Sequence, residues 1–179
     1  MNLKEQTFLN GYKKLRDEVD QQCTKLEQEH ANHIKCKSGC DFCCMNYNIF
    51  PIEFYSILTD LKHKQFNPAK ISDSKYNEQD CIFLFNHRCT IYDVRPIICR
   101  THGLPLLYLN DDDEWELSTC ELNFQNYNFE LFTNKNTFAQ DTFNSKLFQL
   151  NRDYIKTIPE QGFTETDLIS LKELTTNLE

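Results

Sequence analysis

Apolar and aromatic side chains recur at every third or fourth position from residue 4 to residue 34, with charged residues between them. Such a spacing places one apolar stripe along a helix and leaves the other face for solvent. The pattern therefore predicts a single long amphipathic helix over residues 4–34. The stripe comprises Phe8, Tyr12, Leu15, Val19, Cys23, Leu26 and His30.

Three side chains at or near this stripe have more than one interpretation. Cys23 is favoured as a small buried core residue over a metal ligand, because unliganded cysteine packs like a small apolar side chain. His30 and His33 lie at the end of the predicted helix, just before a cluster of cysteines. They are favoured as partly exposed residues that interact with the helix dipole, and a role as ligands is the alternative.

A second, short helix is expected next in the chain. Pro51 suits a first helical turn, and Phe54, Leu58 and Leu61 follow it at helical spacing. Residues 64–80 are polar and lack periodicity, which predicts a surface loop.

The C-terminal part of the chain also shows helical spacing. One stripe comprises Phe143, Leu147, Leu150 and Tyr154. Further on, Thr164-Glu-Thr-Asp167 resembles a capping box with Asp in place of Glu. It predicts the start of a last helix that carries Leu168, Leu171 and Leu178.

Two short hairpins are expected in the middle of the chain. In the segment 81–92, two apolar runs flank Asn86-His87-Arg88, which is typical of a hairpin turn. In the segment 106–117, two apolar runs flank an acidic stretch over residues 110–114. That stretch is interpreted as a solvated turn in preference to a site for a hard cation.

These elements together predict a mainly α fold, in which helical arms surround an irregular cysteine-rich metal-binding centre with one or two small β-hairpins. We expect one domain over residues 1–179. Its metal-binding region spans residues 36–120, and its arms span residues 1–35 and 137–179.

Composition narrows the partners that the protein can have. The formal net charge is −8, and no run of Lys or Arg occurs, which argues against a nucleic-acid-binding surface. No apolar run approaches the ~18 residues of a membrane-spanning helix, and the first residues carry no apolar signal core. The chain has nine cysteines, an odd number, so a cytoplasmic protein with reduced thiols is expected.

Clustered cysteines are the candidate metal-binding residues of the chain. The stretch Cys36-Lys-Ser-Gly-Cys40-Asp-Phe-Cys43-Cys44 places four thiols within one short loop, and Gly39 allows the backbone to turn sharply before Cys40. Thiolates this close repel one another and oxidise unless a metal shares their charge. Structural disulfides are a less favoured alternative. Eight cysteines lie in this middle region and are the candidate metal ligands: Cys36, Cys40, Cys43, Cys44, Cys81, Cys89, Cys99 and Cys120.

The number of metal sites stays open at this point, since one site needs four ligands and two would need all eight. Cys36, Cys40 and Cys43 are expected in one site, which Cys99 or another distal cysteine completes. Their spacing is also that of a three-thiolate loop holding a [4Fe–4S] cluster. Adjacent side chains usually diverge, so Cys43 and Cys44 are not expected to join one mononuclear site.

Arg95 and Arg100 bracket Cys99 and are candidate cofactor-binding residues. Four thiolates on Zn²⁺ or on a [4Fe–4S] cluster leave a net negative charge, which a guanidinium offsets by donating hydrogen bonds to sulfur. The equally weighted alternative is a surface arginine paired with a carboxylate.

A family resemblance rests on these motifs. The pattern Cys36-x3-Cys40-x2-Cys43-Cys44, followed by Cys81-Ile-Phe-Leu-x4-Cys89-x-Ile-Tyr-x2-Arg-Pro-x2-Cys99-Arg100, resembles the YkgJ-like cysteine-cluster family. That family is known as a zinc- or iron-chelating CxxCxxCC domain. The resemblance spans about residues 36–105. Ile82 stands where the family often has Pro, and Thr101-His102 replaces a more usual aromatic residue, but neither change removes a cysteine.

The resemblance implies a metal centre and leaves its chemistry open. The first hypothesis is an iron–sulfur cluster, with [4Fe–4S] favoured, in a redox or regulatory protein. The second is Zn²⁺ in a structural or metal-handling protein. The third is a cluster-dependent, methylase-like enzyme acting on a protein or small molecule, because a related cysteine cluster occurs in the flagellin lysine methylase. No catalytic residue can be assigned by that likeness, and no protein partner is identified.

Overall fold

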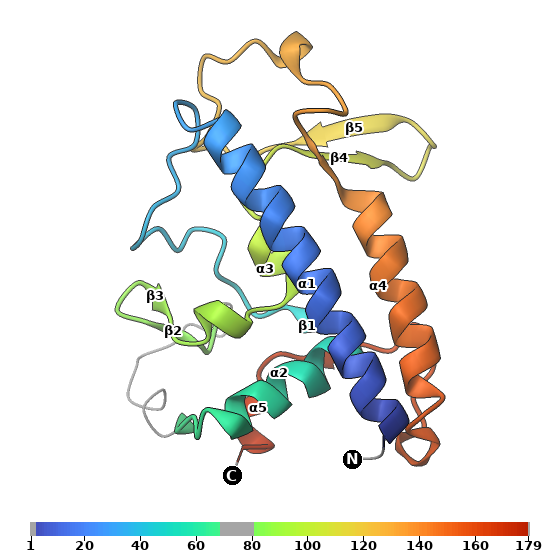
Figure 1. Ribbon diagram of the computed structural model, residues 1–179. Coiled ribbons are helices and arrows are strands. Elements are labelled where there is room, and N and C mark those ends of the chain that lie inside the picture. The colour runs from blue at the N-terminus through green and yellow to red at the C-terminus, as the bar shows by residue number, and fades with distance from the viewer. Residues whose placement is uncertain (1–2, 69–80, 179) are drawn as a thin grey trace. The chain divides into compact units, whose positions relative to one another are not determined.

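The computed structural model describes residues 3–68 and 81–178 and contains mostly helices with a few very short strands (Figure 1). This architecture confirms the predicted mainly α fold. Two compact units make up the chain. Unit 1 comprises Met1–Lys14, Ser38–Pro96 and Phe148–Glu179, and unit 2 comprises Leu15–Lys37 and Ile97–Leu147. Each unit therefore combines a part of the predicted arms with a part of the cysteine-rich middle, and the single-domain organisation stays a prediction.

Helix α1 (Leu3–Glu29) confirms the long amphipathic helix, and its buried stripe runs from Leu9 to Leu26. The helix ends before the predicted residue 34, since residues 30–33 form a turn. Cys23 is buried, as expected for a core residue. His30 is only 3% exposed, so the prediction of a partly exposed terminal histidine is wrong.

In unit 1, the core forms around α2 (Pro51–His63). The helix begins at Pro51, whose missing N–H is not needed in a first turn. The side-chain oxygen of the buried Asn151 accepts a hydrogen bond of 3.2 Å from the Ile52 N–H, one of the donors that a helix start leaves unpaired. Glu53, also buried in the first turn, accepts a hydrogen bond of 3.0 Å from the Tyr12 hydroxyl.

Two strand pairs and short helices complete unit 1. Strand β1 (Asn48–Ile49) pairs antiparallel with β7 (Ile169–Ser170), and β2 (Leu84–Phe85) pairs with β3 (Arg88–Cys89). The second pair confirms the predicted hairpin. The 3-10 helices η2 and η4 and the short helix α5 span Tyr92–Val94, Pro159–Gln161 and Glu173–Thr176.

The predicted start of a last helix at Thr164 is wrong. Asp167 does accept a hydrogen bond of 2.7 Å from the Thr164 N–H, as in a capping box. The chain then enters strand β7, where pairing with β1 places Ile169 opposite Ile49 and both are buried. Cross-strand burial therefore outweighs the local helix signal. Most of the predicted surface loop, residues 69–80, lies outside the described residues.

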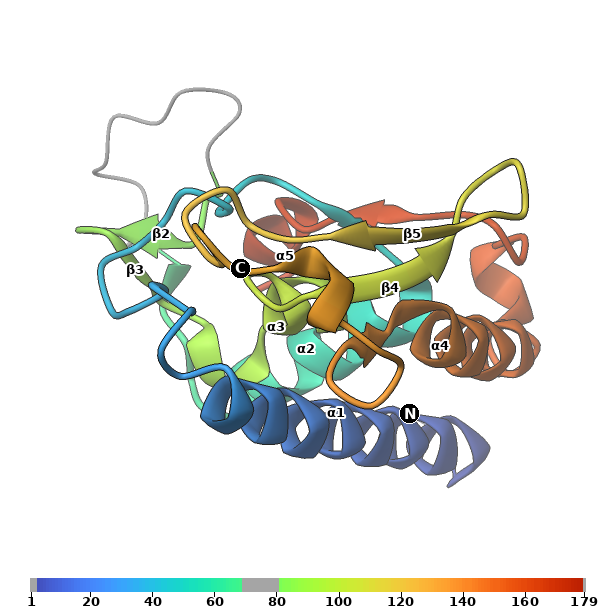
Figure 2. The same cartoon turned by 90° about the horizontal axis from the view of Figure 1, so that it is seen from above.

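In unit 2, strands β4 (Leu106–Leu109) and β5 (Trp115–Ser118) form the second predicted hairpin (Figure 2). Strand β6 (Phe138–Ala139), which was not predicted, pairs parallel to β4 and gives the sheet order β5-β4-β6. The chain continues from β6 directly into helix α4 (Gln140–Ile155). Helix α3 spans Ile97–Thr101 and the 3-10 helix η3 spans Phe129–Leu131.

An aromatic cluster closes the C-terminal end of α1 within unit 2. The ring of His30 lies edge-on to Phe124 at a centroid distance of 5.2 Å, and its Nε2 atom lies 2.7 Å from the carbonyl oxygen of Asn136. Within the described residues, no helix is long and apolar enough to cross a bilayer.

Candidate metal centre

The cysteine loop of unit 1 begins with a turn at Gly39. This glycine has φ +96°, a conformation that L-residues rarely adopt, and it confirms the predicted sharp turn before Cys40. The backbone N–H of Cys44 donates to the carbonyl of Asp41 at 2.8 Å, so the next residues also form a tight turn. The sequence therefore presents Cys40, Cys43 and Cys44 on one compact loop.

The adjacent thiols of Cys43 and Cys44 contact each other. A hydrogen bond between their side chains, assisted by burial, raises the pKa of Cys43 well above its usual range. The expectation that these two cysteines do not join one mononuclear site stays a prediction.

Cys81 and Cys89 lie in or beside the core of unit 1, where Cys44 also packs. Burial raises the pKa of the Cys81 thiol to about 11, with a further contribution from the nearby Cys89. Burial also raises the pKa of Cys89. Cys81 precedes strand β2 and Cys89 ends strand β3, and the N–H of Cys81 donates to the carbonyl of Cys44 at 3.4 Å. Three candidate ligands thus belong to one packed region.

Arg95 is positioned to influence one of these thiols. Its guanidinium stacks on Tyr92, 3.7 Å from the ring centroid, and donates to the Tyr92 carbonyl at 2.9 Å. Its positive charge partly offsets the rise in the pKa of Cys89. Arg95 therefore lies near Cys89, and its expected role of donating hydrogen bonds to sulfur at a cofactor stays a prediction.

In unit 2, the sulfur of Cys36 rests against Asn123 and Gly103. The Asn123 side-chain N–H donates to the Cys36 Sγ at 3.3 Å and to the Gly103 carbonyl at 2.6 Å. Its oxygen accepts from the Lys35 N–H at 2.7 Å. Asn123 is only 3% exposed, so this amide fixes three chain segments at once.

Gly103 leaves the room that this arrangement needs. Its φ is +90°, and a Cβ atom there would lie 2.7 Å from the Cys36 Sγ. That separation is well below a van der Waals contact, so an added Cβ atom would displace the Cys36 sulfur, and the positive φ also favours glycine. The other two candidate ligands of unit 2 are half-buried, Cys99 in α3 and Cys120 in the loop after β5, where the Cys120 carbonyl accepts from the Asn123 N–H at 2.9 Å.

Arg100 forms an ion pair with a carboxylate. Such a pair was expected for the alternative interpretation, in which this arginine lies on the surface. Its Nη1 atom lies 2.6 Å and 2.5 Å from the two carboxylate oxygens of Asp20. It is not a surface residue, because its side chain is only 3% exposed. The Arg100 carbonyl also accepts a hydrogen bond of 3.5 Å from the Cys23 thiol. A role of Arg100 towards a cofactor stays a prediction.

The donor set fits a metal chemically, because thiolates are ligands of both zinc and iron–sulfur clusters. All nine cysteines are thiols and none is half of a disulfide. Among residues 3–68 and 81–178, no three His, Cys, Asp or Glu side chains are grouped closely enough to hold a metal ion.

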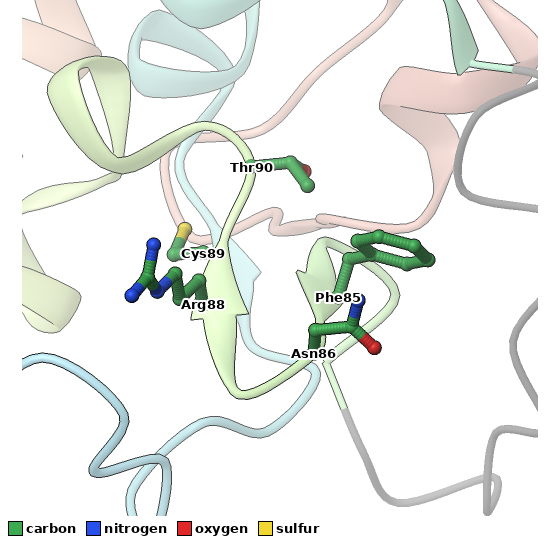
Figure 3. Close-up of a pocket in the computed structure, with 5 residues that line it drawn as sticks. All are labelled: Phe85, Asn86, Arg88, Cys89 and Thr90. Carbon is green, nitrogen blue, oxygen red and sulfur yellow. The ribbon is translucent and has the colours of Figure 1, made fainter.

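A surface hollow of about 490 Å³ lies at the β2–β3 hairpin (Figure 3). It is lined by Phe85, Asn86, Arg88, Cys89 and Thr90. In Figure 3 the side chains of Arg88 and Cys89 project to one side of the hairpin and those of Phe85 and Thr90 to the other. A second hollow of about 250 Å³ shares Cys89 and Thr90 with the first. Cys89 is therefore a thiol that solute can approach from the surface.

Sequence reasoning missed Asn123 and Gly103. Nothing in the spacing of Asn123 marks it, because its partners lie far away in the sequence. Gly103 did carry a signal: the chain has four glycines, and of the three with positive φ, Gly39 and Gly103 both occur near candidate cysteines. In a glycine-poor chain, a glycine near a ligand indicates a turn or a close approach.

Comparison with known proteins identifies one family. No curated protein and no solved structure matches the chain. A family model does match residues 35–121, which include all eight candidate ligands and exclude Cys23. Over these residues the chain matches the CxxCxxCC family, described as a putative zinc- or iron-chelating domain, and the family resemblance predicted from the cysteine motifs is thereby confirmed.

Proposed function

We propose that the protein binds an iron–sulfur cluster, of the [4Fe–4S] type, through cysteine thiolates between residues 36 and 120, and that it has a redox or regulatory role. The observation that carries this proposal is the confinement of eight reduced cysteines to the segment that matches the family. A bound cluster would supply a centre that accepts and donates single electrons.

The loop Cys36–Cys44 is proposed to supply the first ligands, because its three-thiolate spacing suits a cluster and its backbone already turns at Gly39. The remaining ligands are proposed among Cys81, Cys89, Cys99 and Cys120. Arg95 is proposed to tune the thiolate of Cys89 by its charge. Reduced thiols fit a reducing compartment, so a cytoplasmic location is part of the proposal.

Purification without oxygen, followed by elemental analysis and an assay for acid-labile sulfide, tests the cluster. Oxygen must be excluded because exposed thiolates oxidise readily. Iron and sulfide in equal amounts, in a brown protein, are the expected result. Stoichiometric zinc without sulfide would overturn the cluster and leave Zn²⁺ as the metal.

Two cysteine variants test the ligands. Cys40→Ser should remove most of the bound metal, because serine is a poor ligand for iron and zinc. Cys23→Ser is the matched control: Cys23 lies outside the family match, and a serine hydroxyl can still donate to the Arg100 carbonyl. Full metal content in Cys40→Ser, or equal loss in both variants, would contradict the assignment.

A further inference from the structure

The β4–β5 hairpin of unit 2 exposes an apolar surface. Paired residues on neighbouring strands share a face of a sheet, and residues two apart on a strand do so as well. The register pairs Leu107 with Leu117 and Leu109 with Trp115. These four side chains, which we call the hairpin apolar face, lie on the same side. Trp115 is 68% exposed and Leu109 is 42% exposed.

The opposite side of the same sheet packs against the protein at β6. Phe138 of β6 pairs with Leu106 and is fully buried, whereas its neighbour Ala139 pairs with Leu107 and is exposed. Phe138 thus covers one end of this side, whereas Glu116 and Ser118 on the same side are exposed. An exposed sheet face is normally polar, so the exposed Leu109 and Trp115 beside the half-buried Leu107 and Leu117 indicate a contact surface.

Strand β5 also has a free edge. It pairs only with β4 among the described residues, at the end of the sheet order β5-β4-β6. An edge strand can accept a further extended strand through main-chain hydrogen bonds, while alternate side chains of the incoming strand contact the sheet face. A strand added at this edge would place every second side chain beside the hairpin apolar face.

The charge around this edge decides which partner fits. The turn of the hairpin carries Asp111, Asp112, Asp113 and Glu114, and Glu116 follows in β5; all five are exposed. From residue 101 to residue 134 the chain contains no Lys or Arg. The turn stands away from α3, at the open end of the hairpin (Figure 1). A cationic partner would meet no competing positive charge along this segment.

We propose that the β5 edge docks an extended segment of a partner protein in which basic residues alternate with apolar residues. The apolar side chains would contact Trp115 and Leu117, and the basic ones would face the acidic turn. A second copy of this chain is disfavoured, because it would bring the same acidic hairpin to this edge, with no Lys or Arg between residues 101 and 134. The inference is independent of the metal centre.

Trp115 makes the test direct, because it is the chain's only tryptophan. The probe is an end-blocked peptide of about six residues in which Val and Lys alternate. Its binding should shift the tryptophan emission to the blue in a saturable way, and added salt should weaken binding. A peptide with Glu in place of Lys should give no shift. A probe N-methylated on the amides of one edge should not bind, since it cannot form main-chain hydrogen bonds.

Variants distinguish binding at the hairpin apolar face from nonspecific binding to other exposed apolar residues. Leu109→Ser should weaken binding about tenfold, whereas Leu168→Ser, a 51% exposed leucine in unit 1, should leave binding unchanged. The double variant Asp111→Asn, Asp112→Asn should weaken binding and reduce its salt dependence. Glu27→Gln, Glu29→Gln, which removes the same charge from the exposed part of α1, is its control.

Several outcomes would overturn the proposal. Equal binding of the N-methylated probe would exclude strand addition. Equal effects of Leu109→Ser and Leu168→Ser, with circular dichroism showing both variants folded, would exclude the hairpin apolar face. A blue shift that grows with protein concentration in the absence of peptide would assign the surface to a second copy of the chain.

Discussion

Gly103 is a residue at which one added methyl group has a predictable result. In Gly103→Ala the new Cβ would lie 2.7 Å from the Cys36 Sγ, and the residue would keep a φ that alanine rarely adopts. We expect a loss of unfolding free energy of about 3 kcal/mol, from backbone strain and displaced packing together. The displaced Cys36 should also reduce metal content. Urea unfolding and elemental analysis measure the two effects.

Gly162→Ala is the control for Gly103→Ala. Gly162 also has positive φ, at +68°, but nothing lies within 4 Å of a Cβ atom there. We expect it to cost about 1 kcal/mol and to leave the metal content unchanged. Equal losses in the two variants would show that the space beside Cys36 is not restrictive.

His102 gives a pH dependence with a defined sign. Burial lowers the pKa of His102 below its usual range, so the unfolded chain takes up a proton more readily than the folded protein. The stability from the neutral ring is present above pH ~6.5 and is lost as the pH falls through the lowered pKa. The slope reaches at most about 1.4 kcal/mol per pH unit.

His102→Gln should flatten this acid-side slope in urea titrations of chelated protein, in which release of metal by acid cannot contribute. His63→Gln, at the exposed end of α2, is the matched variant and should keep the slope. A slope that survives in His102→Gln would mean that another group is responsible.

At the scale of elements, the β2–β3 hairpin depends on two residues with positive φ. Asn86 and His87 have φ values of 48° and 60°, which define the two-residue loop of a tight hairpin. Asn86→Val should destabilise the protein by about 1–2 kcal/mol more than Asn86→Gly, because a β-branched residue does not tolerate this conformation and glycine does. Urea unfolding of the two variants provides the comparison, and equal stabilities would contradict the assigned turn.

Elements with a strong period were predicted correctly from the sequence. The stripe in α1, the proline at the start of α2 and the turn residues of both hairpins are local signals that the structure confirms. Strands β1, β6 and β7 were missed because each pairs with a segment far away in the sequence, without the local turn signal that marks a hairpin. The Thr164 hydrogen bond formed as expected, yet pairing of Ile169 with Ile49 directed the chain away from a helix.

For the whole molecule, we expect metal removal to weaken the middle of the chain more than the helices. The candidate ligands occur between residues 36 and 120, whereas most helical residues belong to α1 and α4. Chelation should lower the Tm by about 10 °C, as expected for loss of a ligand present at roughly 1,000 times its Kd. Far-UV circular dichroism should keep most of its helical signal. An unchanged Tm in metal-depleted protein would refute the coupling.

The candidate site was predictable in its residue types but not in its surroundings. Eight cysteines in one segment indicate metal chemistry from spacing alone, and the family match over residues 35–121 agrees with that prediction. The sequence could not reveal that Asn123 holds Cys36, or that Arg100 pairs with Asp20, because these contacts join residues 80 or more positions apart. Such pairings are set by tertiary packing and produce no periodic pattern in the sequence.

The raised pKa values of the buried thiols have a consequence for how ligands can be counted. Cys43, Cys81 and Cys89 should hold their protons at neutral pH, and a metal binds only the thiolates. Each of the three that ligates must therefore release a proton to the solvent when the centre is loaded. In a pH-stat, changing a true ligand to Ala should lower the release by about one proton per centre. Changing a cysteine that does not ligate should leave the proton release unchanged. The number of protons released during reconstitution therefore gives the number of these cysteines that bind the metal.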